Sequence, residues 1–166
     1  IFQIWIRPVE PDTGHFALRL AMYELDRLIR LGLTREEFEK TRQFLSKYVN
    51  LLTRTKTAEL GYAIDSRFYG IPDYNTYIKQ ALARLTPDDV NRAIRKHLRT
   101  TDLHIVAVAR NCDALRSRLL ADEPSPITYN APKPAEILEE DKIVAAWKLE
   151  LKPENVRIIP VEKIFE

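Results

Sequence analysis

The hydrophobic positions of the chain recur mainly at helical spacing. Between residues 13 and 31 they fall every three to four residues, at Leu18, Ala21, Met22, Leu25, Leu28 and Ile29. This period predicts an amphipathic helix, and Gly32 ends it because glycine readily adopts the left-handed conformation that follows many helices. A second apolar stripe predicts a helix after residue 34, and its members are Phe38, Thr41, Phe44, Leu45, Tyr48 and Leu52.

The stretch LTREEFEKTRQFL specifies the start of that second helix. Thr34 can accept a hydrogen bond from the Glu37 N–H, while the Glu37 carboxylate accepts one from the Thr34 N–H. This reciprocal pair is a capping box, and Leu33 and Phe38 flank it as a hydrophobic staple. The sequence therefore predicts where this helix begins.

The stretch LTPDDVNRAIRKHL specifies a further helix start at Thr86. Pro87 takes the first helical position, and Asp88 and Asp89 lie in the first turn, where carboxylates favour the positive end of the helix dipole. Three more helices are predicted, over residues 57–70, 73–85 and 111–123.

Other segments have the pattern of β-strands. Phe2, Ile4 and Ile6 alternate with polar neighbours, which predicts a strand from residue 1. The β-branched run LHIVAVAR, residues 103–110, predicts a strand inside a sheet, and residues 156–159 and 164–165 predict apolar segments that dock on a surface. The order of elements predicts an α+β fold, in which a helical layer packs on a mainly antiparallel sheet that is incomplete at its N-terminus.

Length and composition are those of a globular protein. The chain has 166 residues, of which 45% are hydrophobic and 30% charged, and this is enough for a hydrophobic core. We expect residues 1–122 to form a partial α+β domain, and residues 123–166, which contain four closely spaced prolines, to form a crossing segment and an extended C-terminal tail. Because the opening strand has no partner nearby in the sequence, we expect the chain to be part of a longer protein.

The charges exclude some classes of partner. The 26 basic and 24 acidic residues give a net charge of +2 and are scattered along the chain. Without a run of like charges there is no polybasic arm for nucleic acid or anionic lipid. No apolar run reaches the ~18 residues that cross a bilayer, so we expect no membrane span, and we read no signal peptide.

The sequence contains no recognised catalytic motif. Its histidines, His15, His97 and His104, form no H-x-x-E-H or H-E-x-x-H pair, so this chain alone provides no helical zinc site. His97 is expected to pack against the core, and Cys112, the single cysteine, to be a partly buried thiol. The four glycines are isolated, which excludes a phosphate-binding glycine loop. We therefore predict no catalytic residue and no metal ligand, and we assign no substrate-binding residue.

Two residue clusters have structural and functional interpretations. Acidic pairs such as Glu36–Glu37 stand at helix starts or in the crossing segment, so helix-end electrostatics is preferred over acid–base catalysis. An aromatic cluster surrounds Arg67, and we expect it to pack in the core or an interface, with substrate lining as the alternative. Its members are Tyr62, Phe68, Tyr69, Tyr74 and Tyr77.

Three segments, in this order, resemble insulinase-like zinc metallopeptidases of the pitrilysin and mitochondrial processing peptidase type. The opening IFQIWIRP resembles the strand that leads into the first helix of their domain. RLGLTREEFEKTRQFL resembles the G-[VIL]-T-x-x-E segment of the family. LTPDDVNRAIRKHL, followed by LHIVAVA, resembles the helix and strand that close the domain. The resemblance covers residues 1–122 and leaves the rest of the chain without a matching motif.

This resemblance implies a C-terminal, metal-free part of a zinc endopeptidase. In that family two similar α+β domains close around an unfolded peptide; one half binds zinc through H-x-x-E-H and a distal glutamate, and the other helps to hold the substrate. The chain would be inert alone and take no cofactor itself, and its partners would be the catalytic half or subunit and the peptide. The family also suggests a periplasmic or cell-envelope location, which the sequence itself does not assign.

No residue is carried over from the family as catalytic. The second half of these enzymes typically has an arginine and a tyrosine just upstream of the strand at which this chain begins. The stretch DSRFYG, residues 65–70, belongs to a different element and does not supply that pair.

Three other functions are open. A paralogue of the same fold that lost catalysis would serve as a scaffold. An unrelated helical interaction module would be indicated by helix without sheet, or by a loose opening segment. Nucleic-acid binding is the least favoured, because Arg92, Arg95, Lys96 and Arg99 have the spacing of a solvated helix face.

Overall fold

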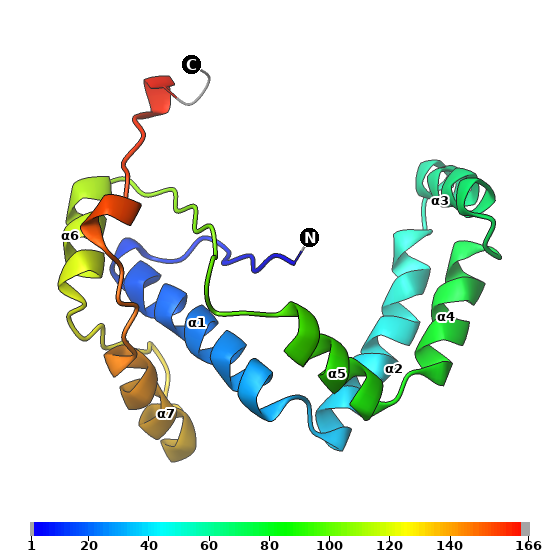
Figure 1. The fold of residues 1–166 in the computed structure, drawn as a ribbon, viewed down its shortest axis with the longest axis horizontal. Helices are drawn as coiled ribbons and strands as arrows, with labels where there is room; N and C mark the ends of the chain where they lie inside the picture. Colours follow the sequence, from blue (N-terminus) through cyan, green and yellow to red (C-terminus); the bar gives the residue numbers. More distant parts are fainter. Residues whose placement is uncertain (1, 164–166) are drawn as a thin grey trace. The chain divides into compact units, whose positions relative to one another are not determined.

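The computed structural model describes residues 2–163, which form helices joined by loops (Figure 1). Over these residues the elements are η1 (Pro11–Thr13), α1 (Gly14–Leu31), α2 (Arg35–Leu52), α3 (Lys56–Tyr69), α4 (Tyr74–Arg84), α5 (Pro87–His97), α6 (Cys112–Ala121), α7 (Ala135–Ala146), η2 (Pro153–Asn155) and η3 (Val161–Lys163). Here η denotes a short 3₁₀ helix. Neither a strand nor a sheet occurs between residues 2 and 163.

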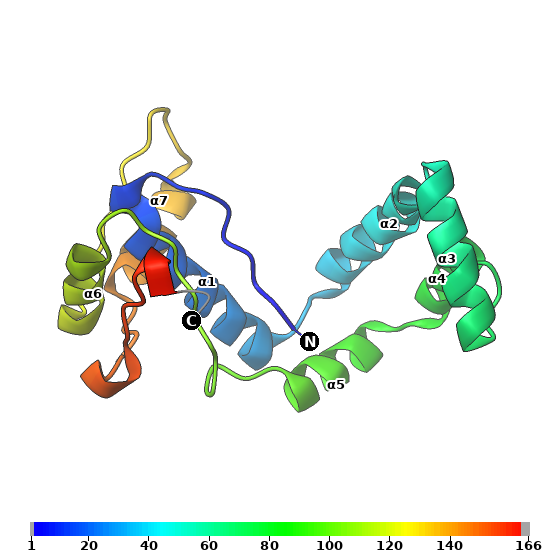
Figure 2. The ribbon, with the colours of Figure 1, turned by 90° about the horizontal axis from the view of Figure 1, so that it is seen from above.

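The predicted α+β fold is therefore wrong for the described residues, which are all-α. Residues 2–9 and 103–109 lack helical structure (Figure 2) and form no β-ladder. A strand is stable only when its N–H and C=O groups pair with those of a neighbouring strand, and alternation in sequence does not supply that neighbour. Residues 156–159 are likewise no strand, and residues 1 and 164–165 lie outside the described part.

The helix predictions are confirmed to within a residue or two at most ends. Thr34 and Glu37 form the predicted capping box: the Glu37 N–H donates to Thr34 Oγ1 at 3.2 Å, and the Thr34 N–H donates to Glu37 Oε2 at 2.8 Å. Thr86 and Asp89 form a second capping box at the start of α5. Gly32 has a φ of +71°, as a glycine after a helix often does.

The chain divides into two compact units. Unit 2 is Leu28–Leu98, and unit 1 contains the chain on either side of it. The predicted boundary after residue 122 does not coincide with this division. The predicted extended tail also contains α7, an element that the sequence reading missed.

In unit 1, α7 packs against α1 (Figure 1). Phe16 of α1 is buried with Val144 and Ala145 of α7, and Tyr23 and Ile127 pack against this cluster. Apolar burial of this kind stabilises the contact between the two helices. Helix α7 is thus part of the core of unit 1.

Arg19 is the polar centre of unit 1. It is not a member of the predicted apolar stripe of α1, yet its exposed fraction is 0%. Its Nη1 donates to the carbonyls of Glu123 and Ala145 at 2.6 and 2.7 Å and to Ser125 Oγ at 2.9 Å, and its Nη2 donates to Asp122 at 2.7 Å. A buried guanidinium requires such partners, and here they connect α1 with the segment after α6 and with the end of α7.

In unit 2, α2 and α4 lie side by side, and α3 contacts α4 (Figure 1). Two side-chain hydrogen bonds of 2.8 Å join α4 to the end of α2: Asn75 Nδ2 donates to Thr53 Oγ1, and Lys79 Nζ donates to Asn50 Oδ1. The buried apolar residues of this unit are Phe38, Val49 and Ile94.

No helix between residues 2 and 163 combines the length and apolar character that a bilayer span requires.

Candidate functional site

The three histidines differ in their exposure to solvent. His15 is buried in α1, with an exposed fraction of 2%, whereas His97 ends α5 and is exposed, as is His104. The prediction that His97 packs against the core is wrong, because Ile94 provides the buried position of α5. The described residues include no group of three or more His, Cys, Asp or Glu side chains that could hold a metal ion.

Cys112 is the first residue of α6 and is partly exposed. Its Sγ–H donates to the Ala109 carbonyl at 3.3 Å. The prediction of a partly buried thiol is confirmed.

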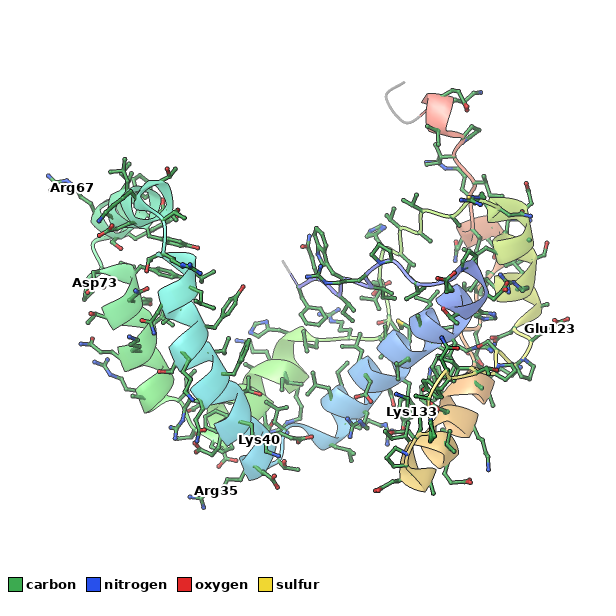
Figure 3. The ribbon with its side chains drawn as sticks, turned by 180° about the vertical axis from the view of Figure 1, so that it is seen from behind. Arg35, Lys40, Arg67, Asp73, Glu123 and Lys133 are labelled. Carbon is green, nitrogen blue, oxygen red and sulfur yellow. The ribbon has the colours of Figure 1, made fainter. Side chains whose placement is uncertain are left out.

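The predicted aromatic cluster separates into two parts. Tyr62 of α3 stacks on Tyr74 of α4 with ring centroids 4.2 Å apart. Phe68 and Tyr69, by contrast, are 80% and 70% exposed, and Arg67 projects from α3 into solvent (Figure 3). The packing prediction is thus right for Tyr62 and Tyr74 and wrong for Phe68 and Tyr69.

Residues 103–109, here called the 103–109 segment, expose apolar side chains on an unpaired backbone. Val106 and Val108 are 90% and 98% exposed, while Leu103 and Ile105 are about half as exposed. Apart from the Ala109 carbonyl, which accepts from Cys112, no backbone group of this segment has a hydrogen-bond partner among residues 2–163. The segment therefore has both unpaired donors and acceptors and two exposed valines at the surface.

Unit 2 carries a second apolar surface, on α2. Phe44, Tyr48 and Leu51 are exposed and follow one another at helical spacing, and the Phe44 and Tyr48 rings stack with centroids 5.4 Å apart. Phe44 and Tyr48 belong to the apolar stripe predicted from the sequence, but of the members of that stripe only Phe38 is buried. Exposed apolar side chains that lie side by side on a helix are a feature of many protein-binding surfaces.

A groove of about 360 Å³ lies between α2 and α4. Three of its lining residues are cationic: Arg42, Lys47 and Lys79. The others are Gln43, Ser46, Leu82 and Ala83.

Those three cations differ in their partners. Arg42 pairs with Glu39 at 2.5 Å and lies over the Phe38 ring, and Lys79 donates to Asn50. The Lys47 side chain forms neither an ion pair nor a hydrogen bond within residues 2–163, although the Lys47 carbonyl accepts from Asn50 Nδ2. The groove is basic and faces solvent, and unit 2 as a whole has 13 basic and 8 acidic residues, a net charge of +5.

Sequence reasoning identified the 103–109 segment as apolar and β-branched but missed its exposure. It missed the basic groove entirely, because the three cations come from two helices whose pairing is not readable from spacing. A charge count restricted to residues 28–98 would have shown the basic excess of that region.

Comparison with known proteins returns no relative. The sequence matches no protein-family model and no curated protein, and no solved structure matches the fold. The likeness to insulinase-like metallopeptidases therefore depends on the three sequence segments alone, and no family is assigned to the chain.

Proposed function

We propose that the chain is a metal-free, partner-binding part of a larger assembly. The observation that carries this is the 103–109 segment, where Val106 and Val108 are 90% and 98% exposed on an unpaired backbone. Covering one valine side chain contributes about 1.5–3 kcal/mol, so a partner that covers both gains appreciable binding energy.

An extended polypeptide is the partner that fits this segment best. Its backbone would exchange hydrogen bonds with the free N–H and C=O groups of the segment, and its side chains would cover the two valines, which is binding by strand addition. The apolar stripe of Phe44, Tyr48 and Leu51 supplies a further contact surface for a folded partner.

The identity that we propose for the assembly comes from the sequence resemblance. On that basis the partner is the zinc-bearing half of an insulinase-like endopeptidase, and the substrate is an unfolded peptide enclosed by both parts. Zinc bound by the partner would polarise the attacking water and the scissile carbonyl, while this chain would hold substrate and have no activity alone.

A second function is a scaffold or helical interaction module without any link to catalysis. The all-α structure of residues 2–163 favours it, because the strands on which the family resemblance partly depends are absent from this part of the chain. Both functions require a bound partner, and they differ in whether that partner carries H-x-x-E-H.

The test begins with affinity purification of the tagged chain from its native cells and identification of the partner. The partner and the chain are then produced separately, and their affinity is measured by calorimetry. If the assembly is a peptidase, we expect the partner to contain H-x-x-E-H. We also expect the complex of partner and chain to cleave an unfolded peptide in the presence of zinc, whereas this chain alone does not.

The variant Val106→Thr/Val108→Thr keeps side-chain shape and strand propensity but removes apolar surface. We expect it to bind the partner at least about tenfold more weakly, while Val161→Thr, a matched change at another exposed valine, binds like the wild type. A partner without H-x-x-E-H would establish the scaffold. Zinc-dependent cleavage by the isolated chain, or equal binding by the double variant, would contradict the proposal.

A further inference from the structure

A small cavity in unit 1 is lined by two residues that each carry a buried polar atom without a partner. It measures about 240 Å³ and is formed by η1, the start of α1, the end of α6 and the segment that follows. Its lining residues are Asp12, His15, Arg118, Glu123, Pro124, Ser125 and Pro126. His15 Nε2 and Arg118 Nε are both buried and have no hydrogen-bond partner among the described residues.

Unpartnered buried polar atoms are uncommon in folded proteins, because each costs the free energy of lost hydration. His15 is almost completely buried, with an exposed fraction of 2%. His15 and Arg118, which each carry such an atom, line the same cavity, and a polar group bound there would supply the missing hydrogen bonds.

The hydrogen-bonding capacity of the wall favours an anion. Arg118 Nε carries a hydrogen and can only donate. A neutral imidazole can carry its hydrogen on Nε2, so His15 can donate as well. Ser125 Oγ already accepts from Arg19, which leaves its hydroxyl hydrogen as a third donor.

The charges around the cavity agree with this. Arg19 is compensated by Asp122 at 2.7 Å, but Arg118 forms no ion pair with any carboxylate between residues 2 and 163. Glu123 lines the cavity, but its side chain projects away from the helices (Figure 3), and Asp12 is exposed at the rim. A partly buried guanidinium without a counterion is completed by an anion.

The geometry points to this cavity as a binding site for a small oxyanion, held by Arg118, His15 and Ser125. A carboxylate and a phosphate share the chemistry required: oxygen atoms that accept from the guanidinium fork and from two further donors. The volume admits a group of that size with room for the carbon atoms that carry it. This site is independent of the partner-binding surfaces described above.

The pKa of His15 should change when an anion binds in the cavity. Burial, followed by the charges of Arg19 and Arg118, lowers the pKa of His15 to about 4, and Asp122 acts in the opposite direction. An anion beside the ring stabilises the imidazolium, so a bound oxyanion raises this pKa toward its ordinary value of 6.5.

The experiment is an NMR titration of the complete chain with sodium acetate and, separately, with sodium phosphate. Sodium chloride at equal ionic strength is the reference. The signals of the His15 ring and of Arg118 Nε–H are followed, and the pKa of His15 is measured with and without saturating anion. We expect saturable shifts of both signals and a raised His15 pKa.

Arg118→Gln should weaken binding at least about tenfold. Arg118→Lys keeps the charge but loses the Nε–H donor, so it should also weaken binding. This variant replaces Arg118→Gln in the test if the glutamine variant does not fold. Arg95→Gln, at an exposed arginine of α5, should bind like the wild type.

Saturation by acetate and not by phosphate would assign a carboxylate ligand. Saturation by phosphate and not by acetate would assign a phosphate ligand. The absence of saturation with both anions would overturn the site. Equal shifts with chloride, or unchanged affinity in both Arg118 variants, would overturn it as well.

Discussion

The side-chain amide of Asn91 pairs with both backbone groups of Leu33. Asn91 Oδ1 accepts from the Leu33 N–H at 2.7 Å, and Asn91 Nδ2 donates to the Leu33 carbonyl at 3.0 Å. The side-chain amide thus forms the two hydrogen bonds that a neighbouring backbone would form, and it connects α5 to the loop between α1 and α2. Within unit 2, these two hydrogen bonds join α5 to residues far from it in sequence.

Loss of this pair should destabilise unit 2. Asn91→Asp keeps the acceptor and loses the donor, and we expect the free energy of unfolding to fall by about 1–2 kcal/mol, and by about 2–3 kcal/mol for Asn91→Ala. Urea unfolding followed by circular dichroism measures both. Asn130→Ala, at an exposed asparagine in a loop, should change stability by less than about 0.5 kcal/mol. Equal stability of all three variants would show that the pair contributes nothing.

Gly32 and Gly61 should respond in opposite directions to alanine. Gly32 has a φ of +71°, and a Cβ there would lie 2.6 Å from Asn91 Oδ1, so Gly32→Ala should cost about 2 kcal/mol or more. Gly61 lies within α3, and a Cβ there meets no atom within 4 Å. Gly61→Ala should therefore raise stability by about 0.5–1 kcal/mol. Thermal unfolding of the two variants provides the comparison, and a loss of stability for both would contradict the open environment of Gly61.

Asp122 should be essential to unit 1. Its removal leaves the guanidinium of Arg19 buried without its counterion, and we expect Asp122→Asn to cost about 3–5 kcal/mol. Asp113→Asn, at an exposed carboxylate of α6, should cost less than about 1 kcal/mol. Chemical denaturation measures both, and similar values for the two variants would contradict the role of the buried pair.

Acid should weaken unit 1 through Asp122 as well. Burial raises the pKa of this carboxyl, but hydrogen bonds from Arg19 and from the N–H groups of Glu150 and Leu149 outweigh it, and the pKa lies below its ordinary value of 3.8. The folded state therefore binds the proton less readily than the unfolded state. The stabilisation is present above pH 3.8 and is lost as the pH falls through the folded pKa.

His15 should make stability depend on pH at higher values. Its pKa is about 4 in the folded chain and 6.5 ordinarily, so between these values the unfolded state binds more protons and stability falls as the pH falls. The full effect amounts to about 3 kcal/mol. Denaturation series at pH 7, 6 and 5 should show the decline in the wild type and a smaller one in His15→Gln. Parallel curves for both proteins would show that another group is responsible.

The helical part of this fold was predictable because its signals are local. Thr34 and Glu37, and likewise Thr86 and Asp89, lie three residues apart and satisfy each other's hydrogen bonds without help from the rest of the chain. Gly32 similarly follows α1 for reasons contained in its own backbone. Such signals fix where helices begin and end, and they do so here.

The missed features depend on contacts between distant residues. Arg19 lies outside the predicted apolar stripe of α1, yet it is buried because Asp122 and Ala145, more than a hundred positions away, provide its partners. The 103–109 segment has the composition of a strand, but a strand also needs a neighbour, and composition does not provide one. The same holds for the cavity of His15 and Arg118, whose walls come from residues 12–15 and 118–126, which are far apart in the sequence.

The division of the chain has a consequence for its biosynthesis. Unit 2 is one uninterrupted stretch, so it can assemble as soon as Leu98 has left the ribosome. Arg19 is translated early, but its hydrogen-bond acceptors extend to Ala145, and until those emerge its guanidinium stays hydrated. Nascent chains stalled before and after that point should differ in protease resistance within residues 14–27, with the early part of α1 protected only in the longer chain.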